Sequence, residues 1–403
     1  MENEKIKILH VLSGLGDGGL EKVVYMIVSG SQSGNIEHFI AVLIKSTNSF
    51  LETDFLKLGC KITVFDFDNR LFDLSSLKKN LIQIIKLAGF IRKNRIMIVH
   101  SHDFFPAFCA RVAAVVTVFF YFYKVRKIFV TLHNSFIWLN KFHHFINRIL
   151  ASFTTKIICV SGSVLEYSLE HDKINRNKYV VISNGIDESL FIPDKNLVDE
   201  YRLEFGISEG KIIIANIGVL SVRKGQKYLI ESFRILSETY DNIVLLIFGS
   251  GREHEAAIEQ ELHKMIENYG LNDKVKIFSP RKDINRIYNI FDIYVMPSIT
   301  EGQSLCVIEA MLMERICLLS DIPSFSEMVE QGVNGFLFKS KDVEDLTLQL
   351  EYLIKSGRDM NYIGKSARAN ALKKYNKKNM VANYLSLYLT GNLNNSINQK
   401  ENA

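Results

Sequence analysis

Apolar runs of strand length alternate with amphipathic segments of helix length along most of this chain. The first series of runs occupies residues 6–12, 39–44, 61–65, 96–100, 127–132, 156–160 and 180–183. A second series occupies residues 211–217, 243–248, 275–278, 293–296 and 316–319. Strands separated by helices pair in parallel through right-handed crossovers. The pattern predicts an α/β protein with two doubly wound, Rossmann-like domains that face a central cleft.

The clearest helical period lies in residues 74–94, and a second helix is expected near residues 21–29. The apolar positions of the longer segment form one stripe, made of Leu74, Leu77, Leu81, Ile84, Ile85, Ala88 and Ile91. Such a stripe is typical of a helix that packs one face against a core.

The length of 403 residues is too great for one ordinary core and predicts more than one domain. The turn-forming segment Asn184-Gly185-Ile186-Asp187 separates the two series of strands. We therefore expect an N-terminal domain at 1–187 and a C-terminal domain at 188–375. A helix at 376–390 is expected to cross back to the first domain, and the polar tail 391–403 is expected to be disordered.

The positive charge belongs to the first half of the chain. Residues 1–187 hold 23 Lys and Arg against 15 Asp and Glu, whereas residues 188–403 hold 26 against 29. This asymmetry suits an N-terminal domain that meets an anionic partner, such as a membrane surface or a phosphate-bearing substrate. An incidental bias of a solvated surface is the alternative.

The five cysteines are scattered and include no C-x-x-C pair, which argues against disulfides and structural zinc. The N-terminus lacks the pattern of a signal peptide. Both features favour a cytoplasmic protein. The most membrane-like stretch, Val112–Tyr123, is shorter than the roughly 20 residues that a spanning helix needs. It fits a buried helix, or an interfacial patch flanked by Arg111, Lys124, Arg126 and Lys127.

The segment Glu301–Glu309 carries two carboxylates eight positions apart, around a glycine and an apolar run. It follows a strand-like run that ends at Pro297-Ser298, so the predicted order is strand, loop and helix. The free N–H groups of a helix start can bind an anion, and carboxylates can accept hydrogen bonds from hydroxyls. The segment therefore suits both phosphate and sugar.

Each predicted domain begins with a glycine-containing turn. In the first, Gly14, Gly16 and Gly19 match G-x-G-x-x-G, but the second strand runs into Lys45-Ser46 without the acidic residue of a dinucleotide site. This disfavours a hydride-transfer enzyme. The second turn, at residues 218–225, carries Arg223-Lys224. These cations could neutralise a diphosphate leaving group, or be solvated loop charges.

Histidines end two of the predicted strands. His133 can donate a hydrogen bond to a sugar hydroxyl or to developing charge. His100, His102 and Asp103 form a His-x-His-Asp cluster, for which we favour a structural or substrate-facing role over a metal site. Asp66-Phe67-Asp68 looks like a metal-nucleotide motif, but so short a match is interpreted as a loop.

Taken together, an ordered set of motifs resembles the retaining glycosyltransferases of family four, which have the GT-B fold. The set spans residues 6–390 and consists of Gly18-Gly19-Leu20-Glu21, Asn184-Gly185-Ile186-Asp187, residues 218–225, Gly249-Ser250-Gly251, residues 297–309 and Ser320-Asp321. Each motif is weak alone, whereas their order and spacing are specific.

The resemblance implies a nucleotide-sugar donor bound by the C-terminal domain, an acceptor bound by the N-terminal domain, and no cofactor or metal. It implies catalytic roles for His133, Glu301, Lys224 and Arg223, and acceptor contacts for His102 and Asn134. The implied donor-binding residues are Gly18, Gly19, Gly218, Arg223, Lys224, Gly249, Arg281, Lys282, Glu301, Gln303, Ser304, Leu305 and Glu309. Among these, Glu309 should bind the ribose, Glu301 the transferred sugar and Lys224 the diphosphate.

Two positions depart from the family pattern. Val219 stands where many members have arginine, and Arg223 is the residue expected to supply the missing charge. Gln303 stands where phenylalanine is common, which leaves the donor sugar open.

The expected activity is transfer of a sugar, with retention, from a nucleoside-diphosphate sugar to a saccharide or lipid-linked acceptor. Assembly of a bacterial surface polysaccharide is the natural setting. The partners are the nucleotide sugar, the acceptor and a possible peripheral membrane contact through the basic domain at the inner face of the cell membrane, with no nucleic acid. The alternative is a non-catalytic nucleotide- or sugar-binding module on the same scaffold.

Overall fold

The structure is a computed structural model that describes residues 5–16, 18–32, 35–45, 50–70, 73–135, 137–251 and 255–393. The chain divides into two compact units. Unit 1 comprises residues 1–185 with 377–403, and unit 2 comprises residues 186–376.

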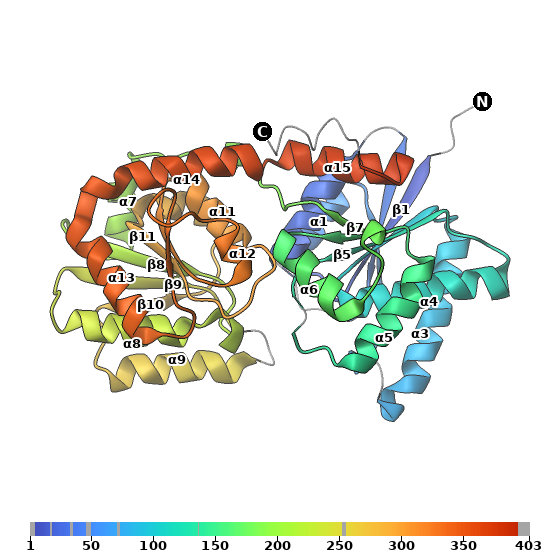
Figure 1. The fold of residues 1–403 in the computed structure, drawn as a ribbon, viewed down its shortest axis with the longest axis horizontal. Helices are drawn as coiled ribbons and strands as arrows, with labels where there is room; N and C mark the ends of the chain where they lie inside the picture. The colour runs from blue at the N-terminus through green and yellow to red at the C-terminus, as the bar shows by residue number, and fades with distance from the viewer. Residues whose placement is uncertain are drawn as a thin grey trace. The chain divides into compact units, whose positions relative to one another are not determined.

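Unit 1 contains a seven-stranded parallel sheet in the order β3-β2-β1-β4-β5-β6-β7. Its strands are β1 Ile6–Leu12, β2 Ile36–Val42, β3 Lys61–Val64, β4 Ile98–His102, β5 Lys127–Leu132, β6 Lys156–Cys159 and β7 Tyr179–Val181. Its helices are α1 Gly19–Gly30, α2 Phe50–Lys57, α3 Leu74–Lys93, α4 Phe104–Tyr121, α5 Lys141–Leu150, α6 Gly162–Asp172 and α15 Lys377–Thr390 (Figure 1).

Unit 2 repeats the plan with a six-stranded parallel sheet in the order β10-β9-β8-β11-β12-β13. Its strands are β8 Ile212–Ile217, β9 Ile243–Phe248, β10 Val275–Phe278, β11 Ile293–Met296, β12 Ile316–Ser320 and β13 Phe336–Phe338. Its helices are α7 Leu197–Glu204, α8 Gln226–Ser237, α9 Ala256–Asn268, α10 Ile284–Ile287, α11 Leu305–Leu312, α12 Pro323–Ser326, α13 Val343–Ser356 and α14 Asn361–Lys374. This is the predicted doubly wound architecture.

The strand order reverses once in each sheet, between β1 and β4 in unit 1 and between β8 and β11 in unit 2. Loops that leave neighbouring strands in opposite directions open a crevice at the carboxyl ends of those strands. Several of the predicted site residues end or follow these four strands, among them Gly18, His102, Lys224 and Glu301.

Helix α4 is longer than the predicted apolar stretch. By length and composition it could cross a membrane, but half of it is buried. Residues such as Cys109, Ala110 and Ala113 pack into the core of unit 1 together with Val99 and Val130. Its first fourteen residues therefore behave as a core helix, while Phe119 and Phe120 in its last turn are exposed.

The apolar stripe predicted for residues 74–94 is wrong in part. Ile84, Ala88 and Ile91 are buried, but Leu74, Leu77, Leu81 and Ile85 are exposed. The buried face of α3 differs from the predicted stripe because polar residues also lie on it. The side chain of Asn80 accepts a hydrogen bond from the backbone N–H of Asp68 at 2.8 Å and donates to its carbonyl at 3.0 Å. These bonds satisfy a polar group that the sequence pattern places on the solvent side.

Several predicted boundaries also shift. Strand β2 begins at Ile36 rather than Phe39, and β4 ends at His102 rather than His100. Strand β13 was not predicted. The loop around Asp66 and Asp68 lies between elements, and its carboxylates pair with Lys79 and Arg70. None of the five cysteines, all of which are described, forms a disulfide.

The last helix, α15, packs on the sheet of unit 1. The hydroxyl of Tyr388 lies 2.7 Å from Nδ1 of His100, and Nζ of Lys127 donates to the carbonyl of Tyr388 at 2.7 Å. Of the predicted disordered tail, residues 394–403 lie outside the described residues.

Candidate functional site

The loops that follow β8 and β11 touch at the switch point of unit 2. The backbone N–H of Ile299 donates to the carbonyl of Arg223 at 2.8 Å. Gly225 has φ +69°, and a Cβ atom there would lie 2.1 Å from the carbonyl oxygen of Pro297. Only glycine tolerates both the left-handed backbone and this close approach. The two loops are thereby held against each other.

This contact brings together three charged side chains that lie far apart in the sequence. Nζ of Lys224 lies 2.5 Å from Oε1 of Glu301, and a guanidinium nitrogen of Arg223 lies 3.1 Å from Oε2. The hydroxyl of Ser298 donates to Oε1 at 3.0 Å. Arg223 also donates to the carbonyl of Thr300 at 3.1 Å. The carboxylate of Glu301 is therefore bound on both oxygens.

Glu301 and Lys224 are both buried. Burial favours the protonated form of Glu301, but the charges of Lys224 and Arg223, with hydrogen bonds from Lys224 and Ser298, outweigh it and lower the pKa of Glu301 below its ordinary value. The carboxylate is ionised at neutral pH. Two cations around one carboxylate leave a surplus positive charge, which suits an anionic ligand.

Two glycines pack beside this cluster. A Cβ atom on Gly249 would lie 1.9 Å from the carbonyl oxygen of Gly218, so the turns after β8 and β9 are in contact. A Cβ atom on Gly218 would lie 3.8 Å from Nζ of Lys224. Gly218 therefore borders Lys224, and Gly249 packs behind Gly218.

Helix α11 starts directly after the loop that holds Glu301. Its N-cap residue, Ser304, is extended, with φ −81° and ψ 117°. The first N–H groups of a helix have no partner within it and carry partial positive charge. The predicted amides of Gln303, Ser304 and Leu305 therefore lie at the positive end of α11.

The second carboxylate of the segment, Glu309, lies inside α11 and is also buried. The hydroxyl of Tyr288 lies 3.0 Å from Oε2 of Glu309 and 3.0 Å from the carbonyl oxygen of Cys306. Burial raises the pKa of Tyr288, so this hydroxyl stays protonated and can donate to the carboxylate. Tyr288 fixes the orientation of Glu309.

Arg281 has a different environment from the one its predicted role suggests. Its guanidinium donates to both carboxylate oxygens of Asp283, at 2.9 and 2.8 Å, and to Glu204 at 2.6 Å. Asp283 also accepts from the hydroxyl of Tyr201 at 2.9 Å. These contacts anchor the loop before α10, so a ligand here would meet the backbone and the exposed residue Lys282 more readily than this guanidinium.

In unit 1, the predicted glycines Gly18 and Gly19 form the start of α1, with Gly18 as the N-cap. The backbone N–H of Lys22 donates to the carbonyl of Gly18 at 3.1 Å. The neighbouring position, Asp17, lies outside the described residues. The loop after β1 therefore presents a helix start at the switch point of this unit.

His133 follows β5 directly and is largely buried. Its Nε2 atom lies 3.1 Å from Nδ1 of His102, and its backbone N–H donates to Oδ1 of Asp103 at 2.9 Å. Asp103 has φ +68°, an unusual backbone conformation for a residue other than glycine. Such strain is often found at functional sites. The predicted acceptor residue Asn134 comes next in the chain and is half-buried.

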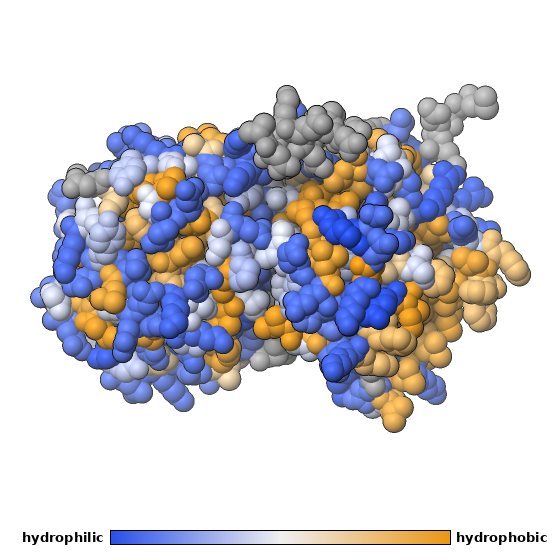
Figure 2. Space-filling model, viewed as in Figure 1, coloured by the Kyte–Doolittle hydropathy of each residue, from blue (hydrophilic) through white to orange (hydrophobic). Residues whose placement is uncertain are grey.

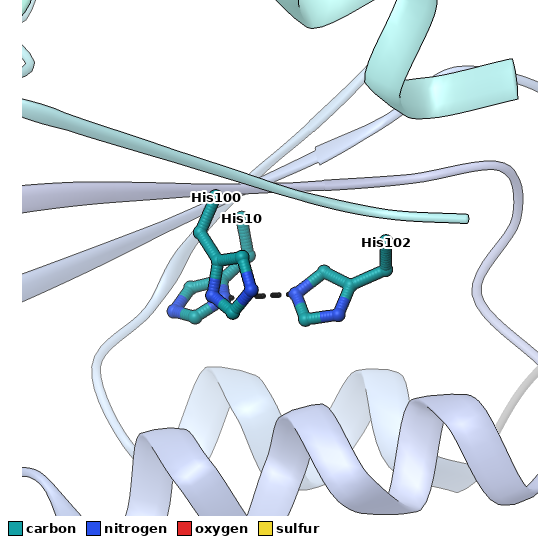
Figure 3. Close-up of side chains that lie close together, drawn as sticks. All are labelled: His10, His100 and His102. Carbon is teal, nitrogen blue, oxygen red and sulfur yellow. Dashed lines mark hydrogen bonds between the residues drawn. The ribbon is translucent and has the colours of Figure 1, made fainter. Parts of the chain in front are cut away.

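His102 belongs to a cluster with His10 and His100, whose rings lie on the same side of their strands (Figure 3). One nitrogen of each lies within 4.8 Å of the others. Nδ1 of His10 is 3.3 Å from Nε2 of His102, and Nε2 of His100 is 2.7 Å from Oγ1 of Thr131. The grouping could hold a metal ion by proximity, but its nitrogens already have protein partners.

Sequence reasoning missed four residues that support these groups: Ser298, Tyr288, His10 and His38, whose Nδ1 atom lies 3.2 Å from Nε2 of His10. The first two lie in the segment that leads to the carboxylates, but no pattern marks them as partners. The two histidines are single polar residues in apolar strands. That placement is a weak signal, which becomes meaningful only when β1, β2 and β4 are known to be neighbours.

Two family models match the chain. Residues 17–190 match the model described as Glycosyltransferase Family 4, and residues 198–370 match the one described as Glycosyl transferases group 1. Together they take in most of both units.

Individual relatives give the same result. The chain is 25% identical to the Escherichia coli UDP-Gal:alpha-D-GlcNAc-diphosphoundecaprenol alpha-1,3-galactosyltransferase, over 78% of this chain and 80% of that protein. It is 25% identical to the Staphylococcus aureus capsular polysaccharide biosynthesis glycosyltransferase CapM, over 59% and 62%.

Among solved structures, the chain is similar to Anabaena Alr3699/HepE in complex with UDP and glucose. The TM-score is 0.81 at 19% identity, and the match covers 94% of this chain and 99% of that one. This likeness confirms the predicted architecture. The chain belongs to the group 1, family 4-type glycosyltransferases and has the GT-B fold.

Proposed function

We propose that this glycosyltransferase moves a sugar from a UDP-sugar to a hydroxyl of a saccharide or lipid-linked saccharide, with retention of the anomeric configuration. The observation that carries the proposal is the group formed by the buried pair Lys224 and Glu301 together with the partly exposed Arg223. Burying the charges of Lys224 and Glu301 is costly, and such a pair is often retained for a role other than stability.

The charges of this group match the two parts of the donor. The surplus positive charge can neutralise a diphosphate, because Lys224 and Arg223 can exchange part of their contact with Glu301 for phosphate oxygens. Glu301 is then able to accept hydrogen bonds from hydroxyls of the transferred sugar. The amides at the start of α11 add a second source of positive potential for the phosphates or sugar.

Glu309 is the residue that we expect to bind the ribose. It comes from α11, the helix that begins after the Glu301 loop, and Tyr288 holds one of its oxygens. A carboxylate held in this way can accept hydrogen bonds from a pair of hydroxyls. Gly18 and Gly19 are proposed to contact the diphosphate from unit 1, and His102 and Asn134 to contact the acceptor.

In the proposed step, the bond between C1 of the sugar and the diphosphate oxygen breaks. C1 forms a new bond to the acceptor oxygen on the same face, and the acceptor proton passes to the leaving diphosphate. The products are UDP and the lengthened saccharide. We propose no side-chain nucleophile and no metal, since the cations of the chain supply the charge that the leaving group needs.

The comparisons support this choice of substrates. The name of the Escherichia coli relative specifies UDP-Gal and a diphosphoundecaprenol-linked GlcNAc, and the Staphylococcus aureus relative is named for capsular polysaccharide biosynthesis. Anabaena Alr3699/HepE has also been solved with UDP-glucose. We therefore propose surface polysaccharide assembly at the inner face of the cell membrane as the setting.

The direct test is a panel of nucleotide sugars. A true donor stabilises the fold by mass action, so its addition should raise the melting temperature. The stabilising donor is then incubated with lipid-linked and free saccharide acceptors, and NMR of the product reports the anomeric configuration. Inversion would exclude the proposed mechanism. Loss of activity in excess EDTA would exclude metal independence.

The alternative, a non-catalytic binding module, is favoured by Val219, which stands where many family members have arginine. In the structure Arg223 occupies the cluster with Lys224 and so supplies a second cation. The panel separates the two functions, because a binding module would be stabilised by a nucleotide sugar but would leave it intact with every acceptor.

We also propose that unit 1 contacts the membrane. Residues 70–150, which include α3, α4 and α5, hold 13 Lys and Arg against two Asp and Glu. The same helices, with the C-cap residue of α4, expose a set of large apolar side chains: Leu74, Leu77, Leu81, Ile85, Phe119, Phe120, Phe122, Phe142, Phe145 and Ile149. Figure 2 shows hydrophobic residues gathered where α3 and α4 lie in Figure 1. Apolar side chains among cations suit an anionic bilayer surface.

The membrane proposal is tested by sedimentation with phospholipid vesicles. Binding is expected with vesicles that contain anionic phospholipid, and the double variant Phe119→Glu/Phe120→Glu should lose it. Leu190→Glu/Leu203→Glu, which adds the same two charges at exposed apolar positions in unit 2, is the control. Sedimentation that neither needs anionic lipid nor responds to the double variant would contradict the proposal.

A further inference from the structure

Four histidines of unit 1 form a continuous hydrogen-bonded line that ends at Ser31. Oγ of Ser31 lies 3.0 Å from Nε2 of His38, and Nδ1 of His38 lies 3.2 Å from Nε2 of His10. Nδ1 of His10 lies 3.3 Å from Nε2 of His102, and Nδ1 of His102 lies 3.1 Å from Nε2 of His133. We call this set of five residues the histidine line.

The line crosses the sheet from strand to strand. His38 is on β2, His10 on β1 and His102 on β4, and His133 follows β5. These four strands are neighbours in that order. Figure 3 shows the contact between His10 and His102, together with the nearby ring of His100. All the members are buried, and His133 is the most exposed of them, at 8%.

Burial keeps these imidazoles neutral. It lowers the pKa of His38 to about 4 and that of His133 to about 3, and with neighbouring histidines it places the pKa values of His10 and His102 well below the ordinary value. A neutral imidazole has one N–H donor and one bare nitrogen acceptor. Four such rings joined nitrogen to nitrogen must all donate in the same direction. Only two arrangements of protons are therefore possible.

Ser31 selects between the two arrangements. Its Oγ atom lies 2.6 Å from the carbonyl oxygen of Ile27, a distance at which the two oxygens need a proton between them. The single hydroxyl proton is thus directed to Ile27, and Oγ must accept from Nε2–H of His38. Nδ1 of His38 then accepts from His10, which accepts from His102, which accepts from His133. Each of the four histidines therefore carries its proton on Nε2.

At the other end of the line, this leaves Nδ1 of His133 as a bare acceptor. Among the described residues, no hydrogen bond involves this atom. The backbone N–H of His133 donates to Asp103, whose own backbone is strained, and the ring is held by His102. The ring can turn little without breaking its bond to His102.

We propose that the histidine line fixes the tautomer of His133, so that its Nδ1 atom accepts a hydrogen bond from a hydroxyl of the transferred sugar. The inference rests on the proposed function for the identity of the ligand. His10, His38 and His102 are positioning residues, because they act through His133. The role is the reverse of the hydrogen-bond donation that we expected from the sequence.

Two other roles are less consistent with the geometry. A general base needs a pKa near the working pH, whereas the pKa of His133 is about 3, so this atom can accept a hydrogen bond but cannot hold a proton at neutral pH. A metal at His10, His100 and His102 would have to displace the bonds of the line and those from His100 to Thr131 and Tyr388.

The first experiment is ¹⁵N NMR of the full chain labelled at histidine. His38, His10, His102 and His133 should each show a protonated Nε2 and an unprotonated Nδ1 before any ligand is added. Addition of UDP-glucose or UDP-galactose, whichever stabilises the protein, should shift the Nδ1 signal of His133, whereas UDP alone should not.

The second experiment uses Ser31→Ala, at the end of the line remote from His133. Without the hydroxyl, the second proton arrangement becomes accessible, and His133 should show signals of both tautomers. We expect kcat/KM for the donor to fall about threefold to tenfold, the equivalent of one weakened hydrogen bond. The control is Ser29→Ala. Ser29 lies in α1, whose C-cap is Ser31, and its hydroxyl donates to the carbonyl of Met26.

Three results would overturn the inference. They are a protonated Nδ1 on His133 in the unmodified protein, an unchanged tautomer in Ser31→Ala, or a stoichiometric metal ion whose removal changes the histidine signals. If no nucleotide sugar binds or is consumed, the proposed function fails while the tautomers still report on the line. The two failures can therefore be told apart.

Discussion

Nζ of Lys224 lies 2.5 Å from Oε1 of Glu301, and both side chains are buried beside the switch point of unit 2. The lysine comes from the loop after β8 and the glutamate from the loop after β11. Their pairing joins the two loops electrostatically, and Arg223 completes the group.

Replacement of Lys224 by alanine should lower kcat about 10²- to 10³-fold, the usual loss when a group that stabilises developing charge is removed. The fold should survive, because Arg223 still pairs with Glu301. Steady-state kinetics and thermal melting measure the two effects. Glu301→Ala should give a similar kinetic loss.

The control for this prediction is Arg234→Ala, which breaks the exposed pair between Arg234 and Glu238 on α8. Exposed pairs contribute at most about 1 kcal/mol, so activity should stay close to that of the unmodified protein. Full activity in both Lys224→Ala and Glu301→Ala would contradict the proposed function.

Tyr288→Phe should raise KM for the nucleotide sugar about fivefold to tenfold with little change in kcat, since Tyr288 orients the carboxylate proposed to bind ribose. Tyr240→Phe is a matched control. Its hydroxyl also donates to a glutamate, Glu351 at 2.9 Å, but that glutamate lies on α13 rather than on α11. Equal effects of the two variants on KM would argue against the role of Glu309.

Gly225→Ala should destabilise the protein more than Gly210→Ala. Both glycines have positive φ, +69° and +81°, so each substitution costs about 1–2 kcal/mol of backbone strain. Only at Gly225 does the new Cβ also meet an atom, the carbonyl oxygen of Pro297 at 2.1 Å, whereas at Gly210 nothing lies within 4 Å. Urea denaturation should show the difference, and only Gly225→Ala should lose activity. Equal destabilisation by the two substitutions would mean that the loop of Pro297 moves away from the new Cβ atom without cost.

Acidification should destabilise the protein at pH values where carboxylates are still ionised. Burial lowers the pKa of His38 to about 4 and those of His100 and His133 to about 3. Below about pH 6.5 the unfolded chain binds protons that the folded chain does not, so stability falls as the pH drops towards these values. Each group can contribute up to about 1.4 kcal/mol per pH unit.

Urea denaturation at about pH 7.5, 6 and 5 measures this dependence. The variant His38→Asn, which removes one of the titrating groups, should show a shallower dependence than the unmodified protein. Equal stability of the unmodified protein at all three values would show that these rings are not held neutral.

Much of the fold follows from the sequence because buried parallel strands are continuous apolar runs. The shift of β4 has a specific cause: His100, Ser101 and His102 are polar, so the apolar pattern ends before the strand does. Their burial is possible because partners on other strands and on α15 satisfy them. Local patterns contain no information about such partners.

In the candidate site, too, the sequence shows the single residues but not the contacts between them. The motifs identified Lys224, Arg223 and Glu301 separately, but their contact depends on β8 and β11 being neighbours despite the 75 residues between Ile217 and Ile293. His10 and His38 could not be identified as functional at all. Each is one histidine in an apolar strand, and only the alignment of β2, β1 and β4 turns them into a connected set.

Helix α15 has a consequence for the synthesis of the chain. It covers the sheet of unit 1 and buries Tyr384 and Tyr388 there, although it is made after the whole of unit 2. About 190 residues separate the two parts of unit 1, which corresponds to roughly 10–40 s of translation at ordinary rates. During this interval the nascent first unit exposes an incomplete apolar surface, so the ribosome-bound chain is the stage at which chaperones have most to protect.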